Sequence, residues 1–267
     1  MEIFITNDDG YTAKGIKELA EMMAPYGNVT VIAPKHAQSG MSMAVNLGGK
    51  VMEYHRLSDE EMGTLGISGC GEWAYLDATP ASCAKFALNT RFLENPPDII
   101  ISGINHGSNA ATASCYSGTL GAAEEGALNG ILSIGVSLDT TDRDPDFSGV
   151  RKLFPKIFEK ILSERPNRFG IYYNVNFPEI PADRIKGVRV GRMGLGKWVR
   201  EFRKCEDEGD VSTWVMQGDY MDDPNNHHSA DHRLLADGYI SIVAHQLDST
   251  DYRETERMKE LGFEQDF

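Results

Sequence analysis

The amino-acid sequence predicts an α/β fold, in which a doubly wound, mostly parallel sheet is followed by a β-rich excursion and a C-terminal helix. Short apolar segments alternate with helical patterns through the first half of the 267 residues, which is typical of parallel strands covered by helices on both faces. The second half is less regular and carries hairpin patterns. With 41% hydrophobic and 25% charged residues, the composition is that of a globular protein with a substantial core.

Four strands of the expected sheet are continuous runs of apolar residues. They read "EIFIT" at 2–6, "NVTVIA" at 28–33, "DIIISG" at 98–103 and "ILSIGVSL" at 131–138. Such short runs, bounded by turn residues, indicate strands that are buried on both faces. Pro34 ends the second run, because proline lacks the N–H group that a central strand needs.

Helical patterns separate these strands at about 13–25, 79–90 and 117–129. The second helix has a clear start, since Thr79 can cap its first turn and Pro80 suits its first position. Helices between short buried strands are the pattern of a parallel sheet with both faces covered.

The second half predicts a longer and less regular series of elements. In chain order these are a helix near 147–163, a strand at 170–177, hairpin strands around 186–193 and 211–217, a strand at 238–245 and a charged helix over about 249–262. The sequence shows no internal repeat and no convincing linker. We therefore expect one integrated unit, with a core over 1–178 that carries the catalytic site and a late region over 179–267.

The charge balance excludes one class of partner. Acidic residues outnumber basic ones by 40 to 26, for a net charge of −14. A chain without a basic surface is poorly suited to the backbone of duplex nucleic acid. A small nucleotide can still bind, because a local site with a metal ion overcomes an unfavourable overall charge.

Cysteine usage and the N-terminal segment predict a cytoplasmic protein. The four cysteines lie far apart and form no C-x-x-C motif, which indicates a reducing compartment. The first strand begins within about two residues of Met1, which leaves no room for a signal peptide. No apolar run is long enough to span a bilayer, so we expect no membrane partner.

Three loops that leave the carboxyl ends of predicted strands carry oxygen-bearing side chains. "NDDG" holds Asp8 and Asp9, "APKHAQSGMS" holds Ser39 and Gly40, and "SGINHGSN" holds Asn105. Open α/β sheets bind their ligands at this edge, so we expect the three loops to converge. Two carboxylates, a hydroxyl and an amide carbonyl, completed by water, suit a divalent ion such as Mg²⁺ or Mn²⁺.

The alternative interpretation of "NDDG" is a solvated turn. Asp-Gly favours tight hairpin turns, and acidic residues are common at strand ends. A hairpin needs a second strand after the turn, whereas "TAKGIKELAEMM" is helical. A lone pair of acids is weak evidence for a metal, so the convergence of three loops is what favours the metal site.

Small residues gather where helix 117–129 begins, in "CYSGTLGAAEEGALNG". Ser117 or Thr119 can cap this helix, and Gly118 and Gly121 allow a ligand to approach the backbone. The free N–H groups and partial positive charge of a helix N-terminus suit a phosphate. The helix alone leaves open a second interpretation, a capped helix with small residues for close packing. An anion site beside a cation site favours phosphate chemistry.

Two further motifs give weaker signals. "GRMGLG" at 191–196 lacks the spacing of a dinucleotide-binding loop, and we expect a flexible loop there. "NNHHSADH" places His228 and His232 four residues apart with Asp231 beside them, which resembles a zinc pair. Because this segment is polar and follows Asp-Pro, we expect a solvated loop.

Four ordered motifs resemble the SurE family of survival proteins. They are "ITNDDG", "QSG" at 38–40, "SGINHG" at 102–107 and "YSGTLGAAEEGAL" at 116–128, and the likeness continues through "DATPASCAKFAL", "NVNFP" and "DGYISIVAHQLDSTDY". The resemblance therefore spans nearly the whole chain. It implies a Rossmann-like core, one divalent metal ion per subunit, and hydrolysis of nucleoside 5′- and 3′-monophosphates, with short polyphosphate as a further substrate.

The resemblance also assigns roles to residues. It implies metal ligands at Asp8, Asp9, Ser39 and Asn105, of which the two aspartates are catalytic, and a phosphate pocket formed by Gly40, Asn105, Ser117, Gly118 and Thr119. It further implies a homodimer or homotetramer formed through late elements, here the 211–220 hairpin region and the C-terminal helix. Two segments, "NAATASCY" and "QSGMSMAV", depart from the family pattern, and both border the pocket that sets substrate preference.

The mechanistic hypothesis is a metal-assisted phosphomonoesterase, in which the helix that begins at Ser117 binds the phosphoryl oxygens. An aspartyl-phosphate mechanism, as in haloacid dehalogenase-like phosphatases, uses two aspartates separated by one residue, whereas Asp8 and Asp9 are adjacent. A nucleotide-binding sensor that does not hydrolyse its ligand is the non-enzymatic alternative. A purely structural protein would leave the convergence of three polar loops unexplained.

Overall fold

The structure is a computed structural model that describes residues 1–68 and 70–265. The centre of this described part is a sheet of nine strands. The strands are β1 (Glu2–Thr6), β2 (Asn28–Pro34), β3 (Tyr54–Arg56), β4 (Glu72–Leu76), β5 (Ile99–His106), β6 (Leu132–Asp139), β7 (Ile171–Pro178), β8 (Val188–Val190) and β13 (Ile240–Gln246). Their order across the sheet is β3-β4-β2-β1-β5-β6-β7-β13-β8. The run from β4 to β7 is parallel, while β3 and β13 are antiparallel to the strands of that run beside them.

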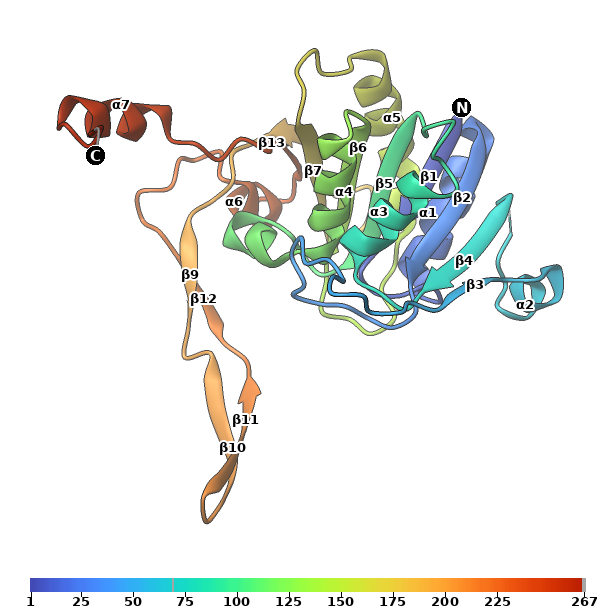
Figure 1. Ribbon diagram of the computed structural model, residues 1–267, viewed down its shortest axis with the longest axis horizontal. Helices are drawn as coiled ribbons and strands as arrows, with labels where there is room; N and C mark the ends of the chain where they lie inside the picture. Colours follow the sequence, from blue (N-terminus) through green and yellow to red (C-terminus); the bar gives the residue numbers. More distant parts are fainter. Residues whose placement is uncertain (69, 266–267) are drawn as a thin grey trace.

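Helices cover both faces of this sheet, which confirms the doubly wound architecture (Figure 1). Ile3 and Ile5 of β1 point into a core that they share with one helix pair, whereas Phe4 between them packs in a second core with the other pair. This alternation follows from the strand geometry, because successive side chains point to opposite faces. The first pair is α1 (Lys14–Met23) and α5 (Ser148–Ser163), and the second is α3 (Pro80–Asn89) and α4 (Gly118–Leu128).

Two of the predicted helix starts are confirmed by their capping contacts. Thr79 accepts a hydrogen bond from the Ser82 backbone N–H (3.3 Å), and Pro80 occupies the first position of α3. Ser117 accepts one from the Leu120 backbone N–H (3.0 Å) at the start of α4. These side chains satisfy N–H groups that have no partner inside the helix.

The β-rich excursion is an arm that extends away from the sheet (Figure 1). Its inner strands β9 and β12 pair with each other, and so do its outer strands β10 and β11, in both cases antiparallel. Every residue of β10 is exposed. The strands are β9 (Gly196–Val199), β10 (Phe202–Glu208), β11 (Val211–Met216) and β12 (Asp219–Asp222).

Strands are present in both segments that were expected to hold hairpin strands, 186–193 and 211–217, but these two strands do not pair with each other. Val188–Val190 instead extends the main sheet as β8, parallel to β13, and Val211–Met216 pairs with Phe202–Glu208. The partner of 211–217 was not predicted because the arm strands pack on no core. Strands that are exposed on both faces lack the alternation of apolar and polar residues that makes a strand visible in a sequence.

Several short elements were not predicted. They are β3, β4, β9, β12, α2 (Asp59–Thr64), α6 (Asp231–Ala236) and the 3₁₀ turns η1 (Ala24–Tyr26) and η2 (Ala111–Tyr116). The predicted C-terminal helix is present as α7 (Tyr252–Glu260) and lies away from the main body (Figure 1). No helix within residues 1–68 and 70–265 is both long enough and apolar enough to cross a membrane.

Candidate active site

The two adjacent aspartates lie in a tight turn at the carboxyl end of β1. The buried Asn7 shapes this turn, because its side chain both accepts a hydrogen bond from the Gly10 N–H (3.2 Å) and donates one to the Gly10 carbonyl (3.0 Å). The chain then enters α1, so the turn does not form a hairpin. Asp8 and Asp9 are therefore presented at the edge of the sheet where open α/β folds bind their ligands.

Asp8 is buried against the start of α4. The Thr119 hydroxyl donates a hydrogen bond to Asp8 Oδ1, and both residues are shielded from solvent. Burial, followed by the neighbouring charge of Asp9, raises the pKa of Asp8 to about 6, while hydrogen bonds from Thr119 act in the opposite direction. A positive charge beside this carboxylate would stabilise its charged form.

Asp9 is held by the end of β5. Its Oδ2 accepts a hydrogen bond from the His106 backbone N–H (3.1 Å). Burial raises the pKa of Asp9, and this hydrogen bond partly opposes the rise. His106 was not expected as a partner, although it follows Asn105 directly in "SGINHG".

Asn105 lies within β5, because that strand runs to His106 instead of ending at the predicted position 103. Its side-chain amide donates to the Gly107 carbonyl (2.7 Å). This bond fixes the amide plane, and Oδ1 accepts no hydrogen bond from any of the described residues. The amide oxygen is therefore available to a ligand.

Ser39 and Gly40 lie beside this cluster in the loop after β2. The preceding Gln38 donates its backbone N–H to the Asp8 carbonyl (2.7 Å), which brings the loop to the end of β1. Both Ser39 and Gly40 are exposed, and in the described part of the chain Ser39 makes no hydrogen bond to either aspartate or to Asn105. The loop thus reaches the site while its hydroxyl stays uncommitted.

The start of α4 differs from the expected phosphate seat in one respect. The Thr119 side chain is fully buried and committed to Asp8. Ser117 caps the helix with its oxygen as acceptor, so its hydroxyl proton is still available to an anion. Gly118 lies directly against Asp8, since a Cβ built on it would stand 3.0 Å from the aspartate Cβ and 3.2 Å from Oδ2.

The oxygen atoms that remain uncommitted fit a hard divalent cation. Asp8 Oδ2, Asp9 Oδ1 and Asn105 Oδ1 have no hydrogen-bond partner among the described residues. Carboxylate and amide oxygens are preferred by Mg²⁺ and Mn²⁺. Within residues 1–68 and 70–265 no three His, Cys, Asp or Glu side chains gather at any point, this cluster included, so a cation here would depend on two aspartates completed by neutral oxygens.

The segment around His228 and His232 is the expected exposed loop as far as His228, but its end is not. Asp231 is completely buried and begins α6, and its carboxylate accepts backbone N–H bonds from Ala111 (3.0 Å), Gly194 (2.9 Å) and His232 (2.9 Å). The same bond to Gly194 anchors the predicted flexible loop at 191–196. The sequence signal was missed because a buried acid surrounded by polar residues looks like any surface aspartate.

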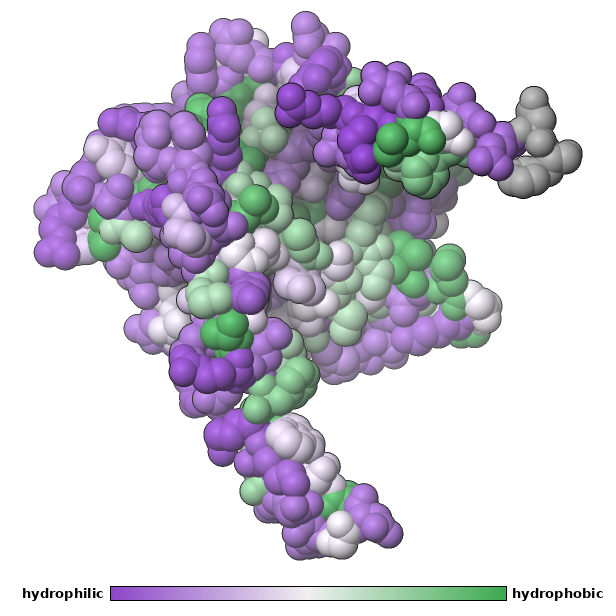
Figure 2. All heavy atoms as spheres, turned by 90° about the vertical axis from the view of Figure 1, so that its left-hand side faces the viewer, coloured by the Kyte–Doolittle hydropathy of each residue, from purple (hydrophilic) through white to green (hydrophobic). Residues whose placement is uncertain are grey.

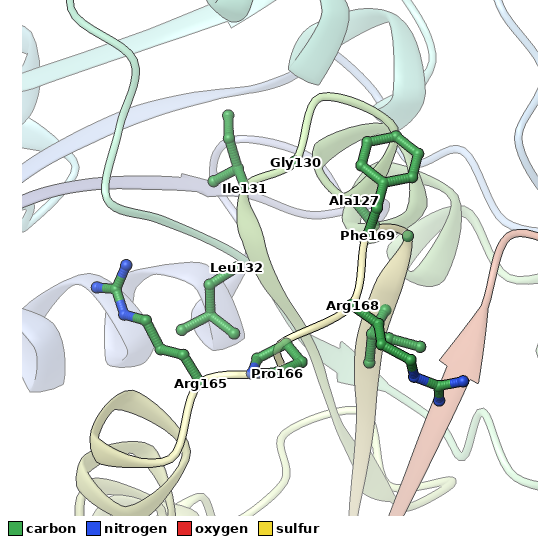
Figure 3. A pocket seen from close by; sticks show the side chains of 10 residues that line it. Ala127, Gly130, Ile131, Leu132, Arg165, Pro166, Arg168 and Phe169 are labelled. Carbon is green, nitrogen blue, oxygen red and sulfur yellow. The ribbon is translucent and has the colours of Figure 1, made fainter.

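A small cavity lies at the opposite, amino end of β6 and β7 (Figure 3). Its volume of about 100 Å³ is well below the roughly 300 Å³ at which small-molecule sites begin. Arg165 and Arg168 extend to opposite sides of it. None of the predicted site residues lines this cavity, so it is separate from the cluster around Asp8.

Comparison with protein families gives a match over most of the chain. The family model described as "Survival protein SurE" matches residues 3–200. A protein of Bacteroides fragilis named 5′-nucleotidase SurE is 35% identical over 261 residues, covering 96% of each chain. A protein of the same name from Bacteroides thetaiotaomicron is 37% identical over 254 residues, covering 94% of this chain and 92% of its own.

Comparison with solved structures also finds a SurE protein. The crystal structure of the SurE protein from Aquifex aeolicus superimposes with a TM-score of 0.80 at 28% identity. The match covers 97% of this chain and 98% of the other. The similarity therefore includes the late region as well as the sheet.

Proposed function

Because the chain belongs to the survival protein SurE family, we propose that it is a divalent-metal-dependent phosphomonoesterase that hydrolyses nucleoside 5′- and 3′-monophosphates. Its relatives are named 5′-nucleotidase, and this chain is an enzyme of that kind. The observation that supports the metal dependence is the pair of adjacent carboxylates, one of them buried, in which one oxygen of each accepts no hydrogen bond from the described residues.

Asp8, Asp9 and Asn105 would hold the cation, and Ser39 would complete the set after a small movement of its exposed loop. A divalent ion bound there would polarise a phosphoryl oxygen and lower the pKa of a nearby water. Mg²⁺ and Mn²⁺ both suit these ligands. The Thr119 hydroxyl keeps the Asp8 carboxylate in one orientation, which is the usual role of a partner behind a ligand.

The phosphate would sit between the cation and the start of α4. Gly118 lies directly against Asp8, and Ser117 precedes it as the cap of the helix. N–H groups at a helix start bind phosphoryl oxygens and stabilise the negative charge that develops on them. Gly40, with no atom within 4 Å of a Cβ built on it, leaves room for the phosphate on the other side.

The arm and α7 support the proposal of a homodimer or homotetramer. The arm exposes large apolar side chains, among them Phe202, Val211, Trp214 and Met216, and α7 buries none of its residues. Figure 2 shows green patches along the arm, which points downward in that view. Apolar surface of this kind is typical of an interface. Four free cysteines agree with the predicted cytoplasmic location.

The decisive experiment measures phosphate release from nucleoside 5′- and 3′-monophosphates and from short polyphosphate, with Mn²⁺, Mg²⁺ or EDTA. We expect release that needs the metal and falls about 100-fold or more in Asp9→Asn. Asp210→Asn, which changes an exposed aspartate at the tip of the arm, is the matched control and should keep full activity.

Two other outcomes would replace the proposal. Tight nucleotide binding without any phosphate release over hours would indicate a sensor. A trapped phosphoaspartate at either carboxylate would indicate the covalent mechanism. Release that survives both EDTA and Asp9→Asn would place the catalytic site elsewhere.

A further inference from the structure

The loop over 107–116 connects two parts of the proposed site. It leaves β5 directly after Asn105 and His106, and it ends where Ser117 caps α4. It is tied to the first part, because the Gly107 carbonyl accepts a hydrogen bond from the Asn105 side chain (2.7 Å) and the Gly107 N–H donates to the Leu138 carbonyl (2.9 Å). One end of this loop therefore lies at the proposed metal ligand Asn105 and the other at the proposed phosphate residue Ser117.

The loop forms one wall of a cavity of about 320 Å³. This volume lies within the range of small-molecule binding sites, and the cavity is open on one side. Gly107 and Ala111 line it from the loop, Asp139 and Thr140 from the end of β6, and Trp198 and Tyr220 from the base of the arm. The lining thus combines an aromatic wall with a carboxylate at the carboxyl edge of the sheet.

The aromatic wall has a defined geometry. Trp198 and Tyr220 are paired across β9 and β12, and their rings meet edge to face with centroids 5.7 Å apart. Tyr220 in turn meets the His232 ring at 5.6 Å, also edge to face. Trp198 is 40% exposed, so part of its surface is free to be covered by a planar ligand.

The polar groups around the wall hold it in place. His232 Nε2 contacts Asp222 Oδ1 (2.9 Å), and the buried Asp231 binds the N–H groups of Ala111 and Gly194 (3.0 and 2.9 Å). These contacts join the arm, α6 and the loop over 107–116 into one unit. By contrast, the Asp139 side chain makes no hydrogen bond with any described residue and can accept one from a ligand.

We propose that this cavity binds the nucleoside part of the substrate, with the base stacked on Trp198 and a ribose hydroxyl donating to Asp139. The proposal rests on the proposed function and names the part of the chain that would recognise the substrate beyond its phosphate. Aromatic side chains bind bases of every kind by stacking, and a carboxylate accepts hydrogen bonds from hydroxyl groups. The arm would then contribute to substrate recognition as well as to assembly.

The first test compares substrates with and without a base. For the wild type and for Trp198→Ala we would measure kcat/KM with AMP and with ribose 5-phosphate. We expect Trp198→Ala to lower kcat/KM for AMP roughly 10-fold, mainly through KM, because stacking on an aromatic ring is lost. The value for ribose 5-phosphate should stay the same. Equal losses on both substrates, or no loss on AMP, would overturn the proposal.

Trp214→Ala is the matched control, because Trp214 is an exposed tryptophan on the same arm and does not line the cavity. It should leave the ratio of the two kcat/KM values unchanged. The oligomeric state of both variants is measured by light scattering. A change of this ratio in Trp214→Ala as large as in Trp198→Ala would also contradict the proposal.

A second test is independent of hydrolysis. Adenosine has no phosphate, so its binding can be followed by the quenching of tryptophan fluorescence in the wild type and in both variants. We expect saturable quenching that is lost in Trp198→Ala and kept in Trp214→Ala. Such quenching in a protein that releases no phosphate would support the cavity while the proposed function fails. Phosphate release from AMP together with unchanged quenching in Trp198→Ala would support the proposed function and overturn the proposal for the cavity.

Discussion

Gly118 lies so close to Asp8 that a Cβ built on the glycine would stand 3.0 Å from the aspartate Cβ and 3.2 Å from its Oδ2. The start of α4 therefore determines where this carboxylate can be. We predict that Gly118→Ala lowers kcat about 100-fold, because a displacement of about 1 Å in a catalytic group costs that much. Steady-state phosphate release from AMP measures the effect.

Gly63→Ala is the control for this glycine. Gly63 is also in a helix, α2, and a Cβ built there would have no neighbour within 4 Å. The activity of Gly63→Ala should match that of the wild type. Circular dichroism should show that both variants are folded, since alanine is favoured over glycine in a helix by about 1 kcal/mol. Full activity of Gly118→Ala would show that the carboxylate position is not critical.

Thr119→Val tests the partner behind Asp8. Valine keeps the shape of threonine and removes the hydroxyl that donates to Asp8 Oδ1. We expect metal affinity or activity to fall about 10- to 100-fold, as is usual when the hydrogen bond that orients a ligand is lost. Titration with Mn²⁺ separates a loss of affinity from a loss of kcat. Thr119→Ser, which keeps the hydroxyl, should retain most of the metal affinity and most of the activity.

Metal affinity should depend on pH through Asp8. Its pKa is raised to about 6, so in the metal-free folded protein a proton binds below that pH and competes with the cation. We expect the Kd for Mn²⁺ to rise by about tenfold per pH unit as the pH falls below 6. Calorimetric titration at pH 5 and pH 7 measures it. Equal affinities at both values would contradict the assignment of Asp8 as a ligand.

The same shift predicts the direction of a stability change. The pKa of Asp8 is raised in the folded state, so the folded protein takes up a proton before the unfolded chain does. As the pH falls from about 6 towards the ordinary value of 3.8, this group alone increases the free energy of unfolding of the metal-free protein. Asp8→Asn should remove that contribution, which urea unfolding in EDTA at several pH values can detect.

Asp231 should be important for stability although it lies outside the metal cluster. Asp231→Ala would leave three backbone N–H groups without their acceptor. An unsatisfied buried donor costs about 1–3 kcal/mol, so we expect the free energy of unfolding to fall by roughly 3 kcal/mol or more. Asp210→Ala, at the exposed tip of the arm, should change it by less than about 0.5 kcal/mol. Urea denaturation of the two variants gives the comparison.

The sheet and its helices could be predicted because burial leaves a plain signal. β1, β2, β5 and β6 are apolar runs, and Thr79 and Ser117 are cap residues that serve as caps. The convergence of Asp8, Asp9 and Asn105 follows from parallel strands alone, since their carboxyl ends meet at one edge. The resemblance to a family added the roles of single residues as metal ligands or phosphate-binding residues, which the pattern of strands and helices does not indicate.

The contacts that arise only from tertiary structure could not be predicted. The bond from the Thr119 side chain to Asp8 was not expected, and it forms because the α4 start packs on the turn after β1. Asp231 and His232 sit in a polar stretch of sequence, and only the fold shows that one of them is buried. Of the arm strands only β11 was expected, because no core imposes a pattern on β9, β10 and β12.

The hydrogen bond between Thr119 and Asp8 joins residues that are 111 positions apart in the chain. On the ribosome, the aspartates emerge long before α4 does. Synthesis proceeds at about 5–20 residues per second, so the nascent β1 waits for several seconds before β5 and α4 can cover it. During that time its apolar side chains are open to chaperones. Translation speed over the first 130 or so codons should therefore influence how much of this protein folds correctly.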